Sequence, residues 1–259
     1  MALVHAVIEA TMPGVVWVDR RETPRWAIVC NLTGFWFALG DAPPRLDVAD
    51  LGPVVARRPP DEPTALWAVS GRWRTVLSPL FAREATRDEF RFDGATRPVP
   101  PDLPPGFEIR PIDAAIASQF GGGTDPWVVK AWGGPEAFAR RAFGVAVLRA
   151  GRLASFCAAC GIGPAVAPEA EIEIGTDPEF RNRGLALCAA NAFIDGCVGR
   201  GMLPAWTCSS ENIASARTAA RLGFRWVRTI SGFPIAADPV VAAGRWAGAA
   251  DEPGPQATA

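Results

Sequence analysis

Short apolar runs separated by turn sequences fill the first third of the chain. They are rich in valine, isoleucine, phenylalanine and tryptophan, and they are too short for ordinary helices, so the pattern predicts strands. The predicted strands are Val15–Val18, Trp26–Cys30, Phe35–Leu39 and Leu66–Ser70. Val48–Arg58 and Trp73–Phe81 have helical character instead. Residues 1–93 are therefore expected to form a small β-rich domain.

A proline-rich segment interrupts this pattern at residues 94–106. Positions 98, 100, 101, 104 and 105 are all proline. Because proline lacks a backbone N–H and has a fixed φ, neither a helix nor a central strand can cross such a segment. We expect a stiff linker and a domain boundary here.

Strands and helices alternate after the linker, and the helices are longer. The predicted strands are Phe107–Pro111, Val145–Arg149, Leu153–Cys160, Glu171–Thr176, Pro204–Cys208 and Phe224–Ile230. The predicted helices are a short one capped by Asp113, one or two within Trp127–Phe143, and the pair Arg183–Arg200 and Ile213–Leu222. This pattern predicts a mixed α/β domain over residues 107–235, followed by a C-terminal extension and loose tail over 236–259.

Charge and composition exclude several classes of protein. The chain has 26 basic and 27 acidic residues, which gives no electrostatic reason to expect nucleic acid or an anionic membrane as a partner. No apolar run approaches the ~20 residues that a membrane-spanning helix needs. The first ten residues lack the pattern of a signal peptide, so we expect a cytoplasmic protein with reduced thiols. A lone histidine, His5, and a single unaccompanied Cys157-x-x-Cys160 pair give no metal site.

The strand over residues 171–176 runs through a short turn into a helix that begins with small residues. A helix start has unpaired N–H groups and the positive end of the helix dipole, both of which suit a phosphate. Gly184 and Ala186 would let a diphosphate approach the backbone, and Arg181 and Arg183 add positive charge. An ordinary strand–turn–helix connection would have the same pattern.

A second segment with the signals of a helix start and a helix end follows later in the chain. Asn212 and Ser215 open a helix, which ends at Leu222-Gly223-Phe224. In this order, the motifs Arg181-x-x-Gly184-x-Ala186 and Asn212-x-x-Ser215 resemble those of the GNAT superfamily of acetyl-CoA-dependent N-acetyltransferases. The resemblance covers about residues 107–230. The segment around Trp17 and the strand after residue 170 also resemble a bacterial subgroup that has an extra N-terminal half and includes acetyltransferases of an aminopolyol antibiotic.

This resemblance implies a mixed, mostly antiparallel sheet flanked by helices, with acetyl-CoA as cosubstrate. Backbone groups of Arg183, Gly184, Leu185 and Ala186 would hold the pyrophosphate. The pantetheine arm would lie beside the strand. The remaining cofactor contacts implied by the resemblance are Ile174 and Thr176 on that strand, and Asn212 and Ser215 on the following helix. Residues 1–93 would be a companion domain or a degenerate lobe of the same kind.

Acetyl transfer needs a neutral amine, so a group must accept a proton from the substrate ammonium. Glu171 and Glu173 are two residues apart on one strand and point to the same face. In the family a strand carboxylate often acts as the base, and we expect at least one of these residues, Glu171 before Glu173, to do so. Either could instead only pair with an arginine. Asp177 is expected to shape the turn before Pro178.

One position departs from the family pattern. The tyrosine that usually protonates the leaving thiolate is replaced by Ala219, and the chain contains no tyrosine. Water, Cys208 or Ser210 would have to replace it, or the acid is dispensable. The prediction is an N-acetyltransferase for a small-molecule primary amine. The alternative is a non-catalytic acyl-CoA-binding or interaction module. The sequence leaves the acceptor, the acyl group and a homodimer open.

Overall fold

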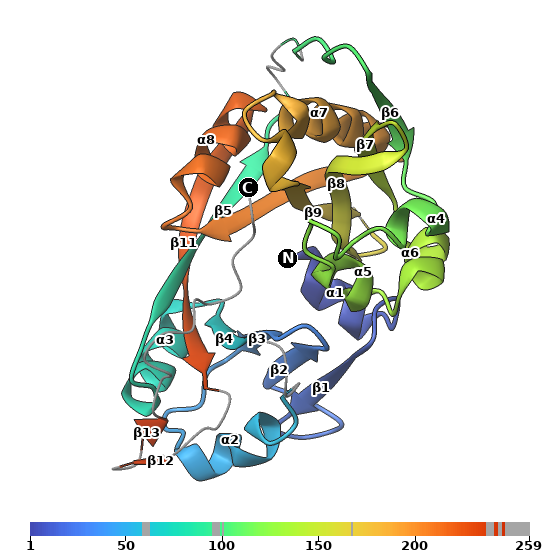
Figure 1. Cartoon of the computed structure of the whole chain (residues 1–259). Coiled ribbons are helices and arrows are strands. Elements are labelled where there is room, and N and C mark those ends of the chain that lie inside the picture. Colours follow the sequence, from blue (N-terminus) through green and yellow to red (C-terminus); the bar gives the residue numbers. More distant parts are fainter. Residues whose placement is uncertain are drawn as a thin grey trace. The chain divides into compact units, whose positions relative to one another are not determined.

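The computed structural model of the chain describes residues 1–58, 63–94, 99, 101–166 and 168–236, together with the backbone of residues 241–242 and 245–246 (Figure 1). The chain divides into two compact units. Unit 1 contains Met1–Met12 and Asp88–Arg228. Unit 2 contains Pro13–Arg87 and the described residues from Thr229 on.

Unit 1 is built on a sheet whose strands, from one edge, run in the order β6, β7, β8, β9, β10, β5 and β11. Their bounds are β6 Phe107–Pro111, β7 Gly144–Arg149, β8 Arg152–Gly163, β9 Glu169–Thr176, β10 Leu203–Ser209, β5 Ala85–Phe92 and β11 Phe224–Ile235. β6 to β9 are antiparallel neighbours, whereas β10 runs parallel to β9. β5 and β11 each belong to unit 1 over only part of their length.

The two faces of this sheet carry different side chains. Ala170, Ile172 and Ile174 of β9 point to one face, where they join a buried apolar cluster with helix α7 (Leu185–Val198). The glutamates of β9 alternate with them and point to the other face. Helix α1 (Ala2–Ile8) packs there against β8 (Figure 1). The alternation in the sequence thus separates an apolar face from an acidic one.

Four further helices complete unit 1. They are α4 Ala114–Ala117, α5 Trp127–Ala131, α6 Pro135–Arg141 and α8 Ile213–Arg221. Side-chain oxygens of Asp113 and Asn212 accept backbone N–H bonds at the starts of α4 and α8, as good N-cap residues do. Trp132, which follows α5, is fully buried and donates its indole N–H to the carbonyl of Ala159 at 2.8 Å. This bond fixes the α5 segment against β8.

Unit 2 has a sheet in the order β1, β2, β3, β4 and the second part of β11. Its elements are β1 Gly14–Val18, β2 Trp26–Asn31, β3 Phe35–Gly40, α2 Val48–Val55, β4 Thr64–Ala68, α3 Gly71–Leu77, a 3₁₀ turn Ser78–Leu80 and the short hairpin β12 Val241–Ala242 with β13 Arg245–Trp246. The core packs around Trp36 and Trp73, both buried, whose indole N–H groups reach the carbonyls of Asn31 and Gly40. The tryptophans of this part of the chain thus contribute large aromatic side chains to the core of unit 2.

One order of elements occurs twice along the chain. In unit 2, three antiparallel strands β1 to β3 are followed by α2, by β4 parallel to β3, and then by α3 and β5. In unit 1, the antiparallel strands β7 to β9 are followed by α7, by β10 parallel to β9, and then by α8 and β11. The two halves of the chain thus repeat one topology.

Several features were not expected from the sequence. Helix α1 and strand β5 were not predicted, and β11 extends five residues beyond the expected end at Ile230. The boundaries of the two units also differ from those of the predicted domains 1–93 and 107–235. Met1–Met12 belong to unit 1, and the chain enters unit 1 again after Arg87 and leaves it after Arg228. The described residues of 94–106 form neither helix nor strand; the rest of that segment and most of 237–259 lie outside the described residues.

A glycine on β8 controls how closely α1 can approach. A Cβ at Gly161 would lie 2.7 Å from the backbone nitrogen of Leu3 and 2.9 Å from its Cα. We expect Gly161→Ala to destabilise unit 1 by about 1–3 kcal/mol, because backbone must move to accommodate the methyl group. Urea denaturation and protease cleavage within residues 1–12 would measure this.

Gly52→Ala in α2 is the matched control, since a Cβ there meets nothing within 4 Å. Alanine favours a helix interior over glycine by roughly 0.5–1 kcal/mol, so this variant should be as stable as the parent or more so. Equal stability of Gly161→Ala and the parent would show that α1 does not pack on β8 as described.

Candidate functional site

The site begins where two parallel strands separate. β9 and β10 are paired at only three positions, which end at Glu171 opposite Ala205. Beyond this point the described parts of β9 and β10 have no further paired positions with each other. On its other side β9 stays paired with β8 as far as Thr176. The separation leaves one backbone edge of residues 172–176 without a neighbouring strand, so that edge can pair with a ligand.

The turn after β9 is held by one buried carboxylate. Asp177 accepts the backbone N–H of Glu179 at 2.9 Å and a guanidinium N–H of Arg152 at 2.8 Å. Arg152 also bonds Glu179 at 2.7 Å and stacks over the ring of Phe180. A Cβ on Gly123 would collide with the Asp177 carboxylate. Asp177 is thus committed to the turn, as expected from its position before Pro178.

Helix α7 begins directly after this turn without a side-chain cap. Asn182 and Gly184 both have positive φ, 61° and 77°, which asparagine and glycine tolerate best. Gly184 is the N-cap residue, and its hydrogen side chain leaves the first N–H groups of α7 without a side-chain acceptor. Arg183 is exposed, while Arg181 is exposed and donates to the carbonyl of Thr176 at 3.3 Å.

The other predicted cofactor residues lie close to this turn in the chain. Ile174 and Leu185 are buried in the apolar cluster, and Ala186 is half-buried against it. The Thr176 hydroxyl shares a hydrogen bond of 2.9 Å with Ser155. The segment 101–105 also reaches the start of α7, because the carbonyl of Pro101 accepts a bond from Cys188 Sγ at 3.5 Å. The structure thus brings the start of α7 and the open edge of β9 together.

The corresponding helix of unit 2 starts quite differently. Asp47 caps α2, and its carboxylate accepts the N–H groups of Ala49 and Asp50. Asp50 bonds back to the Asp47 N–H at 2.9 Å, which completes a capping box. Two carboxylates therefore occupy the position that an anion would take, and their negative charges would repel an anion. Of the two corresponding helix starts in the described part of the chain, that of α2 has a side-chain cap and that of α7 has none.

The second predicted motif has a largely structural part. The Asn212 side chain caps α8 by accepting the Ser215 N–H at 3.0 Å. Ser215 is buried, and its hydroxyl accepts the indole N–H of Trp206 at 3.1 Å. Ser215 is therefore committed to holding Trp206 of β10. Ala219 is fully buried in the apolar cluster, so core packing fills the position of the expected tyrosine. Cys208 is fully buried, and Ser210 Oγ is buried without a hydrogen-bond partner in the described part of the chain.

A cavity of about 160 Å³ lies in unit 1 beside the point where β9 and β10 separate. It is lined by Glu169 and Glu171 of β9, by Leu203–Thr207 of β10, by Glu89–Arg91 of β5, by Val227 and Arg228 of β11, and by Met1. Glu171 is only 5% exposed. Its carboxylate accepts the Thr207 hydroxyl at 3.1 Å and the Leu3 N–H at 3.4 Å. Glu173 is buried as well, but it does not line the cavity.

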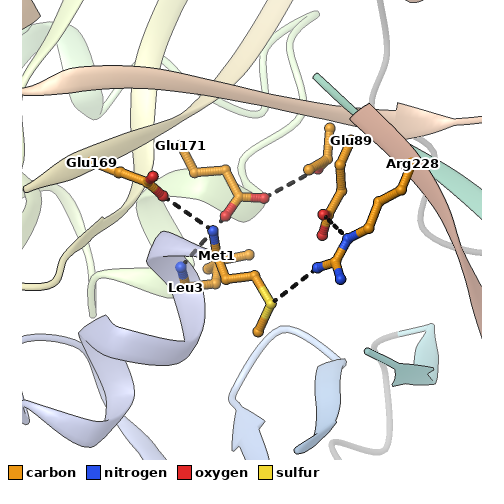
Figure 2. Close-up of polar contacts among 7 residues, drawn as sticks. Met1, Leu3, Glu89, Glu169, Glu171 and Arg228 are labelled. Atoms are coloured by element: carbon orange, nitrogen blue, oxygen red, sulfur yellow. Dashed lines mark hydrogen bonds and ion pairs between the residues drawn. The ribbon is translucent and has the colours of Figure 1, made fainter. Parts of the chain in front are cut away.

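Figure 2 shows an ammonium group among these carboxylates. The α-ammonium of Met1 donates to Glu169 Oε2 at 3.3 Å. Burial by itself would lower the pKa of this group. The negative charges of Glu171, Glu169 and Glu89 and the bond to Glu169 outweigh burial and raise the pKa above its usual value. Glu89 also pairs with Arg228 at 2.6 Å, and a guanidinium nitrogen of Arg228 lies 3.8 Å from the Met1 sulfur.

Several of these residues were not predicted from the sequence. Glu169 continues the spacing of Glu171 and Glu173 on one strand face, so the alternation alone could have identified it. Glu89, Thr207 and Arg228 reach the cavity from strands that are distant in the sequence, and no local pattern indicates them. Among the described residues, no group of three or more His, Cys, Asp or Glu side chains is suited to hold a metal ion.

Comparisons with known proteins show the family and the fold of the chain. The family model described as GNAT acetyltransferase matches residues 1–233. The match extends beyond residues 107–230, where the two sequence motifs lie, into the first half of the chain. The chain is also 30% identical over 229 residues to the uncharacterized N-acetyltransferase YdfB of Bacillus subtilis (strain 168), with 86% of each chain covered.

Solved structures show the same fold. A GCN5-related N-acetyltransferase-like protein from Streptococcus suis 89/1591 matches with a TM-score of 0.70 and 21% identity, over 90% of this chain and 93% of its own. A tandem GNAT protein from the clavulanic acid biosynthesis pathway matches with a TM-score of 0.54 and 13% identity, over 89% of this chain and 85% of its own. The fold is thus the expected mixed, mostly antiparallel α/β fold.

In the described part of the chain, no helix is both long and apolar enough to span a membrane. Membership of the subgroup that includes acetyltransferases of an aminopolyol antibiotic stays a prediction. The family match and the curated relative establish that the chain belongs to the GNAT acetyltransferase family and is an acyltransferase.

Proposed function

We propose that the chain transfers an acetyl group from acetyl-CoA to a primary amine of a small molecule. One observation carries the proposal: β9 and β10 separate directly beside a cavity that contains a buried carboxylate, Glu171. The separation offers an extended ligand one strand edge, and the cavity offers an amine a proton acceptor. These two features lie within one unit of the chain.

The start of α7 fits the pyrophosphate of coenzyme A. Its first N–H groups have no side-chain acceptor, and Gly184 adds no side chain of its own over them. Arg181 and Arg183 add positive charge that remains in solvent. The open edge of residues 172–176 would pair with the pantetheine arm, beside Ile174 and Thr176. Acetyl-CoA supplies an acyl group activated as a thioester. The aspartates that cap α2 would exclude a second molecule from unit 2, so the proposal requires one cofactor per chain.

Glu171 is the base in this proposal. Glu171 lies at the last position where β9 pairs with β10, and it lines the cavity. Glu173 does not line the cavity. The Leu3 N–H and the Thr207 hydroxyl hold its carboxylate in place. Hydrogen bonds from both sides keep this carboxylate oriented before a substrate arrives.

The transfer balances as a direct displacement. Glu171 accepts one proton from the acceptor ammonium, which leaves a neutral amine with a lone pair. The amine nitrogen forms a bond to the thioester carbonyl carbon, and the carbon–sulfur bond breaks. The departing thiolate and the proton that the new amide loses give a free thiol. Water or the Ser210 hydroxyl relays that proton, since the buried Ala219 cannot.

Gly184→Glu tests the cofactor site. A glutamate at the α7 N-cap would direct a carboxylate toward the N–H groups assigned to the pyrophosphate. A ligand that binds only the folded chain at about 100 times its Kd stabilises it by roughly 2.7 kcal/mol, a rise in Tm on the order of 5 °C. We expect this rise with CoA and acetyl-CoA for the parent chain and none for Gly184→Glu. Calorimetric titration should give one site per chain.

Gly201→Glu is the control for strain and charge. Gly201 also has a positive φ, 67°, and a Cβ there meets nothing within 4 Å. This variant should lose a similar amount of stability but keep the whole shift caused by CoA. Loss of the shift in both variants, or in neither, would contradict the assignment of the pyrophosphate to α7.

Glu171→Gln and Glu173→Gln separate the two candidate bases. General-base catalysis typically contributes about 10²–10⁴-fold to a rate. Glu171→Gln should therefore lower kcat by at least about 100-fold at neutral pH, and raising the pH should partly restore the rate because more of the amine is then neutral. CoA binding should be unchanged. A larger loss of kcat in Glu173→Gln than in Glu171→Gln would reverse the assignment, and an unchanged rate in both would remove it.

A further inference from the structure

Glu169 has a position in the cavity that catalysis by Glu171 does not explain. The two glutamates point to the same face of β9 and are two residues apart. At about 3.3 Å per residue, their Cα atoms are separated by about 7 Å along the strand. Glu171 lies where β9 and β10 separate, so Glu169 lies one step farther from the proposed site of transfer.

The structure already holds a primary ammonium at this place. The Met1 nitrogen lies 3.3 Å from Glu169 Oε2, and the charges of Glu171, Glu169 and Glu89 favour its protonated form (Figure 2). The group lines the cavity together with both β9 glutamates. An ammonium that stays protonated is a poor nucleophile. The position next to Glu169 therefore suits a cation that binds without reacting.

The arginines that line the cavity lie on the strands β5 and β11, not on β9 with the glutamates. Arg228 pairs with Glu89, and Arg91 adds a second guanidinium to the lining. These arginines would repel a cation on the β5 and β11 side. The favourable region for an ammonium is accordingly the β9 side, between Glu169 and Glu171.

The size of the cavity limits what can accompany the ammonium. A volume of 160 Å³ is close to that of cavities of roughly 150 Å³ that bind a single benzene molecule. Leu203, Pro204 and Val227 give part of the lining an apolar character. A short carbon chain fits this description better than a sugar ring with several hydroxyl groups.

We propose that Glu169 binds a second, non-reacting ammonium group of the acceptor, so that the preferred acceptors are small diamines. This inference rests on the proposed function, because the first amine reacts beside Glu171. Glu169 is in this account a specificity-determining residue. In this structure the Met1 ammonium occupies the position beside Glu169, so a diamine must displace it.

The test compares putrescine with butylamine, which has the same carbon chain but one amine. For the parent chain we expect kcat/KM to be at least about tenfold higher for putrescine. Glu169→Gln should lower kcat/KM for putrescine by about 10- to 100-fold, mainly through KM, and change the value for butylamine by less than about threefold. Glu136→Gln is the matched control, because Glu136 is an exposed glutamate on α6 that does not line the cavity. It should leave both values unchanged.

Binding gives a second readout that does not depend on turnover. Putrescine should raise the Tm of the parent chain and of Glu136→Gln, but not that of Glu169→Gln. The intact mass of each preparation establishes whether Met1 begins the purified chain, because an altered N-terminus would move the competing ammonium.

The outcomes separate the two proposals. If Glu169→Gln lowers kcat/KM equally for both amines, or if the parent chain turns over both amines without preferring putrescine, the inference is overturned. The acetyltransferase function would still stand. A putrescine shift that requires Glu169, without acetylation of any amine, would support the ammonium site and contradict the proposed reaction. Absence of a putrescine shift in the parent chain would overturn the inference directly.

Discussion

The separation of β9 from β10 after Glu171 and Ala205 is the constraint on which the site depends. Three paired positions keep the strands together at one end, and beyond them β9 keeps only its pairing with β8. Everything assigned to the site is arranged around this point: the open edge of residues 172–176, the buried Glu171, and the cavity. Paired along their whole length, the two strands would leave neither an open edge nor a place for a ligand between them.

The repeated topology shows that the fold alone does not make the site. Both halves of the chain have antiparallel strands, a crossover helix and a parallel strand. At α2 the side chains of Asp47 and Asp50 complete the hydrogen bonds of the helix start, which stabilises the helix and excludes anions. At α7 the same position has Gly184 and no side-chain cap. A few residues at two helix starts thus make the difference between a capped start at α2 and an uncapped start at α7, where we propose that the pyrophosphate binds.

Much of the fold could be predicted because local patterns determine it. The alternation in β9, the small residues at the start of α7 and the Asn212 cap are all local signals, and each element lies close to its expected position. Strand β5 was missed because its charged, half-buried side chains lack an apolar run. Helix α1 was missed because seven residues give too little periodicity. The cavity lining could not be predicted, since Glu89, Thr207 and Arg228 meet only through the order of the strands.

We propose that an acyl-CoA lies between β9 and β10 with its acyl group facing the cavity that holds Glu171. A crystal structure of the chain with acetyl-CoA tests it most directly. We expect pyrophosphate oxygens within hydrogen-bond distance of the backbone N–H groups of residues 183–186, the pantetheine along residues 172–176, and the thioester carbonyl beside the Glu171 carboxylate. A cofactor bound at α2, or with its thioester directed away from Glu171, would contradict this placement of the cofactor and the role of Glu171.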